Sequence, residues 1–326
     1  MIQSLFDSFK DLNILIIGDV MMDAYLWGKV DRISPEAPVP IVAVHQKESR
    51  LGGATNVALN IKALAANPII CAVVGDDKEG DEFLALLAQE NIDANGIVKI
   101  KNRQTTVKTR VIAQNQQMLR IDAETDIEIS DAETELVIAK FEQILAKNTI
   151  HTIIFEDYDK GLITQKLINK VSEIAKQKNI PIVVDPKKRN FLSYLGVAVF
   201  KPNLKELKEG LKIDFDPKNA IALKNAVSSL QQKIAAENIL LTLSELGVYV
   251  LTAHEEKLTP AHIRNVADVS GAGDTVISVV ATAIAAGADI FTAAQLGNLA
   301  GGLVCEKVGV VPIDVNLLLK EALIYQ

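Results

Sequence analysis

Residues 152–185 read TIIFEDYDKGLITQKLINKVSEIAKQKNIPIVVD, and this stretch indicates how the chain folds. The apolar runs 152–155 and 182–184 are typical of buried strands, and residues 164–178 between them have the apolar spacing of a helix. A strand, a helix and a second strand in this order form a right-handed crossover between parallel strands. The stretch therefore predicts one unit of an α/β fold.

The alternation of strands and helices continues along the chain. Hydrophobic residues make up 49% of the sequence, enough for a large core, and aromatic residues only 5%, which suits parallel strands buried under helices. We predict a single domain over residues 1–326, with a mostly parallel sheet flanked by helices on both faces. The other predicted strands are residues 13–17, 69–74, 197–200 and 239–243, and the other predicted helices are 56–66, 79–90, 131–147, 204–211 and 218–236.

Two segments, at about residues 20–46 and 97–123, have strand-like patterns and no helix. The first contains the prolines Pro35, Pro38 and Pro40. Both segments leave and rejoin the sheet near its carboxyl edge, where ligands bind in α/β folds. We predict that they pair as a small β-lid over that edge. A pair of surface hairpins is the alternative.

Charge and cysteine content exclude several classes of protein. A formal charge of −7 offers no basic excess for coating nucleic acid. Cys71 and Cys305 form neither a disulfide framework nor a C-x-x-C pair, which favours the reducing cytoplasm. Residues 1–11 contain no apolar secretory segment. Residues 275–305 carry only one charge, Asp289, but their glycines and alanines favour buried helices over a membrane span.

The strongest local motif is residues 268–275, DVSGAGDT, followed by an apolar helix. Small residues let the backbone approach a ligand, and the N–H groups at a helix start favour phosphate or developing negative charge. The candidates are therefore the backbone of Gly271, Ala272 and Gly273 and the carboxylate of Asp274. An ordinary turn with a capping aspartate is the alternative. The sequence contains neither a P-loop nor a dinucleotide-binding glycine fingerprint.

A second group of residues suits sugar hydroxyls, which need paired donors and acceptors at close range. Gly52 and Gly53 open a helix whose first turn contains Asn56, and Asp19 and Asp23 follow the first strand. Turn-forming and helix-capping aspartates are the alternative reading of the last two. Asp157 also follows a predicted strand, and so lies at the expected ligand edge.

A third group suits a nucleotide and hydrated Mg²⁺. Asn203 and Glu206 share one face of a first helical turn, from which they can hold magnesium through water. Thr242 and Ser244 end a strand and could contact a phosphate, with Gly247 allowing the turn. A capped helix and a hairpin are the alternatives. Cationic candidates for a substrate phosphate are Lys108, Arg110, Arg120 and Lys187, with a solvated charged face as the alternative.

In chain order, the motifs at 52–56, 203–206, 242–247 and 268–274 resemble the ribokinase (PfkB-type) sugar kinases, with Val269 where threonine is common. The resemblance covers nearly the whole chain and implies a ribokinase-like fold, ATP and Mg²⁺. It implies that Asp274 is the base. It adds Glu245 and Asn298 to the nucleotide site, and assigns Asp19, Gly53, Asn56 and Asp157 to the sugar. A monovalent cation is common in such kinases, and here we expect it near Asp268 and Gly309.

A narrower resemblance points to the kinase part of bacterial heptose-phosphate kinase/nucleotidyltransferases. It rests on residues 18–25, 32–40, 157–161, 185–187 and 110–120, the last including Asn115-Gln116-Gln117. It implies phosphorylation of D-glycero-D-manno-heptose 7-phosphate at the anomeric hydroxyl, toward the ADP-heptose of lipopolysaccharide. Leu51, Thr55 and Glu156 depart from the pattern, and a carboxylate at 156 would repel an anionic substrate.

Since the chain ends near residue 326, we expect a stand-alone kinase with a separate nucleotidyltransferase in the pathway. Exposed lid strands lead us to expect a homodimer. Two alternatives stay open. One is a ribokinase-like kinase of another sugar, sugar phosphate or nucleoside, and the other is a non-catalytic sugar- or nucleotide-binding regulator.

Overall fold

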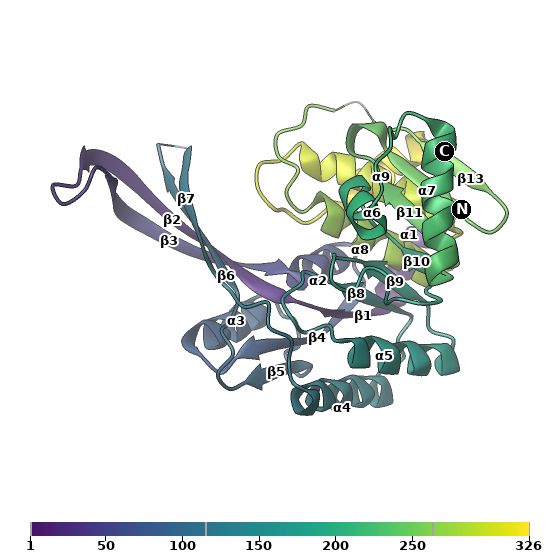
Figure 1. The fold of residues 1–326 in the computed structure, drawn as a ribbon, viewed down its shortest axis with the longest axis horizontal. Coiled ribbons are helices and arrows are strands. Elements are labelled where there is room, and N and C mark those ends of the chain that lie inside the picture. Colours follow the sequence, from purple (N-terminus) through teal and green to yellow (C-terminus); the bar gives the residue numbers. More distant parts are fainter. Residues whose placement is uncertain (1, 115, 263, 326) are drawn as a thin grey trace.

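The strands gather in two sheets, a large one in the body of the molecule and a small one that extends from it (Figure 1). This computed structural model describes residues 2–114, 116–262 and 264–325, so Asn115 of the lid motif lies outside the described residues. In spatial order, the nine strands of the large sheet are β13 (Glu256–Thr259), β12 (Val248–Leu251), β11 (Asn238–Thr242), β10 (Val199–Phe200), β9 (Ile182–Asp185), β8 (Thr152–Glu156), β1 (Asn13–Gly18), β4 (Asn67–Gly75) and β5 (Ile97–Ile100).

Helices cover both faces of this sheet. α2, α8 and α9 pack together on one face, and α4 and α5 pack together on the other (Figure 1). The helices are α1 (Ile2–Ser8), α2 (Ala54–Ala63), α3 (Lys78–Gln89), α4 (Asp131–Lys147), α5 (Gln165–Lys178), α6 (Leu204–Leu211), α7 (Ala220–Ile234), α8 (Ala272–Ala285), α9 (Ile290–Cys305) and α10 (Val315–Ile324), with the short 3-10 helices η1 (Phe9–Asp11) and η2 (Ser244–Leu246).

The strands from β5 to β11 pair in parallel, and only the pairs β11–β12 and β12–β13 are antiparallel. This confirms the predicted α/β fold with a mostly parallel sheet. The sequence reading missed β12 and β13, which add an antiparallel edge, and also missed α1 and α10.

The small sheet has four strands in the order β3 (Pro40–Gly53), β2 (Val20–Ile33), β6 (Val107–Ala113) and β7 (Gln116–Ala123). β2 follows β1 almost directly and β3 leads into α2, so the sheet is anchored at the carboxyl end of β1. The predicted range 97–123 began too early. Residues 97–100 form β5 beside β4, because Val98 and Ile100 are buried on the large sheet. The range 20–46 ended too early, since β3 continues to Gly53.

The nearly uncharged stretch 275–305 forms α8 and α9, as the small-residue pattern predicted. Gly297 and Gly301 let the two helices come close: a Cβ at either position would lie 2.8 Å from a valine methyl group, of Val280 and Val276 respectively. Among the described residues, no helix is both long and apolar enough to cross a membrane. The close packing of α8 on the sheet brings its N-terminus to the carboxyl ends of the strands.

Candidate active site

A cleft of about 1250 Å³ lies at the carboxyl ends of the strands, between the small sheet and the N-terminus of α8. Glu156, Asp185 and Thr242 line it from the ends of β8, β9 and β11. Most of the predicted site residues line this cleft, namely Asp23, Gly52, Gly53, Asn56, Lys108, Arg110, Lys187, Asn203, Glu206, Thr242, Ser244, Glu245, Gly247, Gly271, Ala272, Gly273, Asp274 and Asn298.

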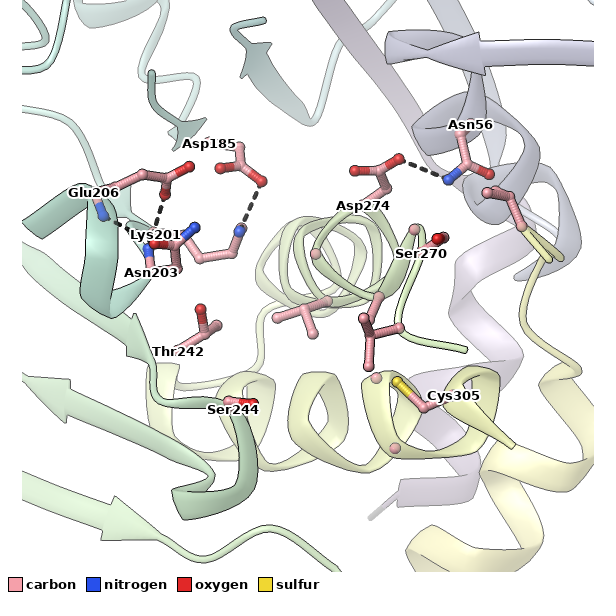
Figure 2. Close-up of a pocket in the computed structure, with 18 of the residues that line it drawn as sticks. Asn56, Asp185, Lys201, Asn203, Glu206, Thr242, Ser244, Ser270, Asp274 and Cys305 are labelled. Carbon is pink, nitrogen blue, oxygen red and sulfur yellow. Dashed lines mark hydrogen bonds and ion pairs between the residues drawn. The ribbon is translucent and has the colours of Figure 1, made fainter. Parts of the chain in front are cut away.

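Asp274 stands in the first turn of α8 and points into the cleft (Figure 2). Its Oδ2 accepts a hydrogen bond of 2.7 Å from the Asn56 amide, and its Oδ1 accepts one of 2.8 Å from the Tyr158 hydroxyl. Burial raises the pKa of Asp274 above its usual range, although both hydrogen bonds act in the opposite direction. The carboxylate is therefore a better proton acceptor than an exposed aspartate would be.

The turn before α8 brings backbone into the same space. Gly271 has a φ of +79°, and a Cβ there would lie 3.0 Å from the Asn56 amide nitrogen, so glycine suits the position twice over. Ala272 N–H donates to the Val269 carbonyl at 3.3 Å. The N–H of Gly273, in the first turn, has no partner within the helix. This arrangement makes the Gly273 N–H the better placed of the predicted anion donors.

A buried ion pair lies beside that turn. Lys201 Nζ lies 2.7 Å from Asp185 Oδ2, with 3% and 6% of the two side chains exposed. A Cβ at Gly273 would lie 3.9 Å from the same ammonium group, which places the cation at the tip of α8. Burial lowers the pKa of Lys201, but the Asp185 carboxylate more than offsets this and the net pKa is raised. The ammonium therefore stays charged.

Neither Lys201 nor Tyr158 was predicted as a site residue, although Lys201 directly follows the predicted strand 197–200 and Tyr158 lies in the motif 157–161. Lys201 precedes Pro202-Asn203 directly after a strand, and Tyr158 follows Glu156-Asp157 directly after another. Position at a strand end was the available signal in both cases. It applied as well to the neighbouring residues, so it could not select these two.

Glu156 is buried at the end of β8 and lines the cleft. Within the described part of the chain, its Oε2 has no hydrogen-bond partner. Burial raises the pKa of Glu156 well above its usual value, and the carboxylates of Asp185 and Asp274 raise it further. Because the raised pKa favours the uncharged form of Glu156, the repulsion of an anionic substrate that we expected from a carboxylate at position 156 is weakened.

Asn203 and Glu206 form the N-terminal capping box of α6. The Asn203 side chain accepts from Glu206 N–H, and Glu206 Oε2 accepts from Asn203 N–H at 2.8 Å. Glu206 Oε1 also pairs with Lys187 at 2.6 Å. The two residues are thus the capped helix that was the alternative reading, and they also face the cleft.

Magnesium can be tested against these donors. Among the described residues, no group of three or more histidine, cysteine, aspartate or glutamate side chains could hold a metal ion. Both Glu206 oxygens already accept hydrogen bonds but keep free lone pairs. The donor set therefore fits an ion that arrives with phosphate ligands and is held through its water shell, and not an ion held by protein ligands alone.

The end of the cleft opposite the small sheet contains a tight turn. The 3-10 helix η2 ends at Gly247, whose φ is +93° and whose Cβ would lie 2.1 Å from the Thr259 carbonyl oxygen. Ser244 and Glu245 are exposed on this turn. Asn298 is buried, and its amide donates to the Pro260 carbonyl at 2.8 Å. Asn203 and Thr242 are bridge partners, so the second and third predicted motifs lie side by side.

The small sheet supplies cations at the near end. Arg110 forms an ion pair with Asp23, and Lys108 lies 3.0 Å from Asp122 and 2.7 Å from Glu124. A Cβ at Gly52 would lie 2.5 Å from the Asp23 carboxylate, so only glycine leaves room for this arrangement. The cations are therefore held in place by acidic partners at the mouth of the cleft.

Three predicted substrate-binding residues do not line the cleft. Asp19 is buried and accepts from the backbone N–H groups of residues 158, 160 and 162 at 3.0–3.1 Å. Asp157 is buried and accepts from the hydroxyl of Tyr194 and the amide of Asn190. Arg120 is exposed and pairs with Asp122. The structure therefore engages Asp19 and Asp157 in contacts within the scaffold and leaves Arg120 outside the cleft lining, so the geometry gives no support to the predicted substrate contacts of these three residues.

Similarity to known proteins shows which family has these motifs. The sequence profile of the pfkB family carbohydrate kinases matches residues 11–315. The chain belongs to this family. Its relatives include Bifunctional protein HldE from Desulfatibacillum aliphaticivorans, which is 40% identical over 94% of this chain, and Bifunctional protein HldE from Aliarcobacter butzleri, which is 40% identical over 92%. The chain covers 62% of the length of either relative.

Solved structures of pfkB-type kinases share the fold at low sequence identity. Phosphofructokinase-2 from Escherichia coli in complex with potassium superposes with a TM-score of 0.77 at 17% identity, covering 96% of this chain and 98% of that one. Ribokinase from Arabidopsis thaliana complexed with ribose and ATP gives 0.72 at 16% identity, covering 95% and 99%. These structures confirm the predicted ribokinase-like fold, and the profile match over residues 11–315 confirms the predicted family.

Proposed function

We propose that this pfkB-family carbohydrate kinase transfers a phosphoryl group from ATP to the anomeric hydroxyl of D-glycero-D-manno-heptose 7-phosphate. The observation that carries the proposal is the position of Asp274, which points into the cleft at the tip of α8 beside a buried lysine. The lid and strand-end motifs that resemble heptose-phosphate kinases supply the choice of acceptor.

In this proposal Asp274 accepts the proton of the acceptor hydroxyl. The oxygen attacks the γ-phosphorus in line, and the proton passes to a carboxylate oxygen as the bond to phosphorus forms. The raised pKa of Asp274, which burial causes, suits a base that works near neutral pH. Asn56 contacts the other side of the same carboxylate and lies where the sugar would bind.

Two donors would stabilise the negative charge of the transferred phosphoryl group. They are the N–H of Gly273 at the start of α8 and the ammonium of Lys201, which lies 3.9 Å from the position that a Cβ at Gly273 would take. Asn203 and Glu206 would order the water shell of Mg²⁺, which neutralises phosphate charge when it is bound with ATP. Thr242, Ser244, Glu245, Gly247 and Asn298 would surround the nucleotide.

The acceptor would bind at the near end of the cleft. Gly52 and Gly53 expose backbone there, and Asp23 offers a carboxylate to sugar hydroxyls. Arg110 and Lys108 are the cations for the acceptor phosphate. Lys187 pairs with Glu206, whose capping box lies at the nucleotide end of the cleft, and so is better placed for a nucleotide phosphate.

The assembly and the pathway belong to the same proposal. The exposed strand β7, with Met118, Leu119 and Ile121, offers an apolar surface through which the small sheet could pair with a second copy. The bisphosphate product would have to lose its 7-phosphate by hydrolysis before a separate nucleotidyltransferase could use it on the way to ADP-heptose. The cytoplasm, ATP as the phosphate donor and a cation near Asp268, which accepts from Gly309 N–H at 3.0 Å, stay predictions.

The test is a panel of free and phosphorylated sugars incubated with ATP and Mg²⁺, with products identified by mass. We expect turnover to be highest with the heptose 7-phosphate. A higher rate with another sugar, sugar phosphate or nucleoside would keep the kinase and replace the acceptor. No turnover with any acceptor would favour the non-catalytic regulator.

Asp274→Asn tests the base itself. The amide keeps the shape of the side chain but accepts no proton, so turnover should fall by about a thousandfold or more while ATP binding, measured by calorimetry, is kept. A variant that retains a tenth of the wild-type rate would exclude Asp274 as the base.

A further inference from the structure

Tyr158 is the one donor to Asp274 that the motifs did not predict. Its hydroxyl lies 2.8 Å from Asp274 Oδ1, and its ring lies below Lys187, whose Nζ is 5.6 Å from the ring centroid. Asn56 occupies the other carboxylate oxygen. The two carboxylate oxygens therefore each hold one donor, and the donors come from segments far apart in the sequence.

The loop that carries Tyr158, residues 157–162, is held by two buried carboxylates. Asp19 accepts from three of its backbone N–H groups, including that of Tyr158 at 3.0 Å. Asp157 accepts from the Tyr194 hydroxyl at 2.7 Å and from its own loop at Asp159 N–H, 2.8 Å. Gly161 completes the turn with a φ of +89°. Such a loop gives the Tyr158 hydroxyl one position.

The torsion that orients an aspartate carboxylate is soft, so a single hydrogen bond leaves the group free to rotate. Two donors on different oxygens remove that freedom. We propose that Tyr158 is a positioning residue for Asp274: together with Asn56 it holds the carboxylate so that the remaining lone pairs face the acceptor hydroxyl. This inference rests on the proposed role of Asp274 as the base.

The Tyr158 hydroxyl also favours the charged form of Asp274. Burial raises the pKa of Tyr158 well above its usual value, and the nearby carboxylates raise it further, so the phenol donates throughout the working pH range. A donor to a carboxylate lowers its pKa. The titratable groups that face Asp274 from other elements are Glu156, Asp185 and Lys201, and a change at Tyr158 leaves all three in place.

Tyr158→Phe removes only the hydroxyl. The pKa of Asp274 should rise, so the acid limb of kcat/KM should move to higher pH by about one unit and kcat should fall about tenfold, with KM for ATP unchanged. The measurement is a pH profile of kcat/KM with the best acceptor of the sugar panel. An acid limb at the wild-type pH would overturn the inference.

Tyr249→Phe is the matched control. Tyr249 also donates its hydroxyl to a carboxylate, that of Glu256, but at the β12–β13 edge and outside the cleft. Its removal should leave the acid limb in place. A shift as large as that of Tyr158→Phe would show that the loss of any buried hydroxyl moves the profile, and would overturn the inference as well.

If Tyr158→Phe does not fold, replacement of Tyr158 by 3-fluorotyrosine keeps the test open. The more acidic phenol is a stronger donor, so the acid limb should move below its wild-type position, and a limb at or above that position would contradict the inference. Failure of the proposed function is recognised separately, because Asp274→Asn would then retain its turnover.

Discussion

The two ends of the cleft are built in different ways. The nucleotide end consists of short local motifs, a capped helix start at Asn203 and a tight turn at Gly247, in which the partners lie within a few residues of one another. At the acceptor end, Asp274 takes its hydrogen bonds from Asn56, 218 residues away, and from Tyr158, 116 residues away.

Because of this difference, we expect side-chain substitutions to cost less stability at the nucleotide end than at the acceptor end. Local motifs are mostly backbone and exposed side chains, so one lost side chain costs little there. At the acceptor end and at the tip of α8, buried charged groups depend on each other, and removal of one leaves another without a partner. Substitutions among these groups should therefore affect stability and catalysis together.

The largest expected effect belongs to Lys201→Met. The variant leaves the Asp185 carboxylate buried without its cation, which should cost about 3–5 kcal/mol of unfolding free energy. It also removes the proposed hydrogen-bond donor to the transferred phosphoryl group, so kcat should fall at least a hundredfold. Urea denaturation and steady-state kinetics measure the two effects.

The double variant Lys201→Met, Asp185→Asn separates the two effects. Without the buried charge, stability should recover, while turnover stays low. Recovery of turnover along with stability would mean that Lys201 serves folding alone, and the contrast between the two ends would lose its catalytic part.

Asp157 tests whether a buried carboxylate outside the cleft serves only the scaffold. Burial raises its pKa from 3.8 to about 6, so between about pH 4 and 6 the folded state binds more protons than the unfolded state. Its contribution to stability is therefore full below pH 4 and is lost as the pH rises through 6, a change of about 3 kcal/mol.

Asp157→Asn should remove that pH dependence. The unfolding free energy of the wild type minus that of the variant, measured by urea denaturation from pH 4 to pH 7, should decrease as the pH rises. A difference that does not change between pH 4 and pH 7 would refute the predicted titration of Asp157.

The smallest expected effects compare two lid arginines. Arg110 lines the cleft and Arg120 does not, although the two are directly paired residues of β6 and β7. Arg110→Ala should raise KM for a phosphorylated acceptor about tenfold, and by less for an unphosphorylated one, because a charge-assisted bond to phosphate is lost in addition to the ion pair with Asp23. Arg120→Ala should change KM less than about twofold. Equal effects would show that the lid acts through its overall charge.

Much of the fold was predictable, because periodicity is a local property. Helix α4 and helix α6 were predicted to the residue, and the predicted parallel strands all lie in the large sheet. The strand β13 was missed because it is short, mostly exposed and at the sheet edge, where the pattern is weak, and β12 was missed although it is a buried apolar run of four residues. The predicted start of the second lid segment at residue 97 was wrong, because the local sequence does not show which sheet a four-residue strand joins.

The candidate site was predictable to the extent that its residues stand in motifs. Residues in glycine turns and capped helix starts, such as Gly53 and Asn203, line the cleft as expected. Aspartates at strand ends were harder. Asp23 faces the cleft, whereas Asp19, four residues earlier, binds the backbone of a neighbouring loop.

The amino-acid sequence alone determined the α/β architecture and the position of the glycine turn before α8, because these follow from hydrophobic period and from backbone freedom within a few residues. Only the tertiary structure decided that Glu156 faces the cleft while its neighbour Asp157 does not, and that Lys201 meets Asp185. Adjacent side chains of a strand point to opposite sides, and partners on different strands meet only after the sheet has formed.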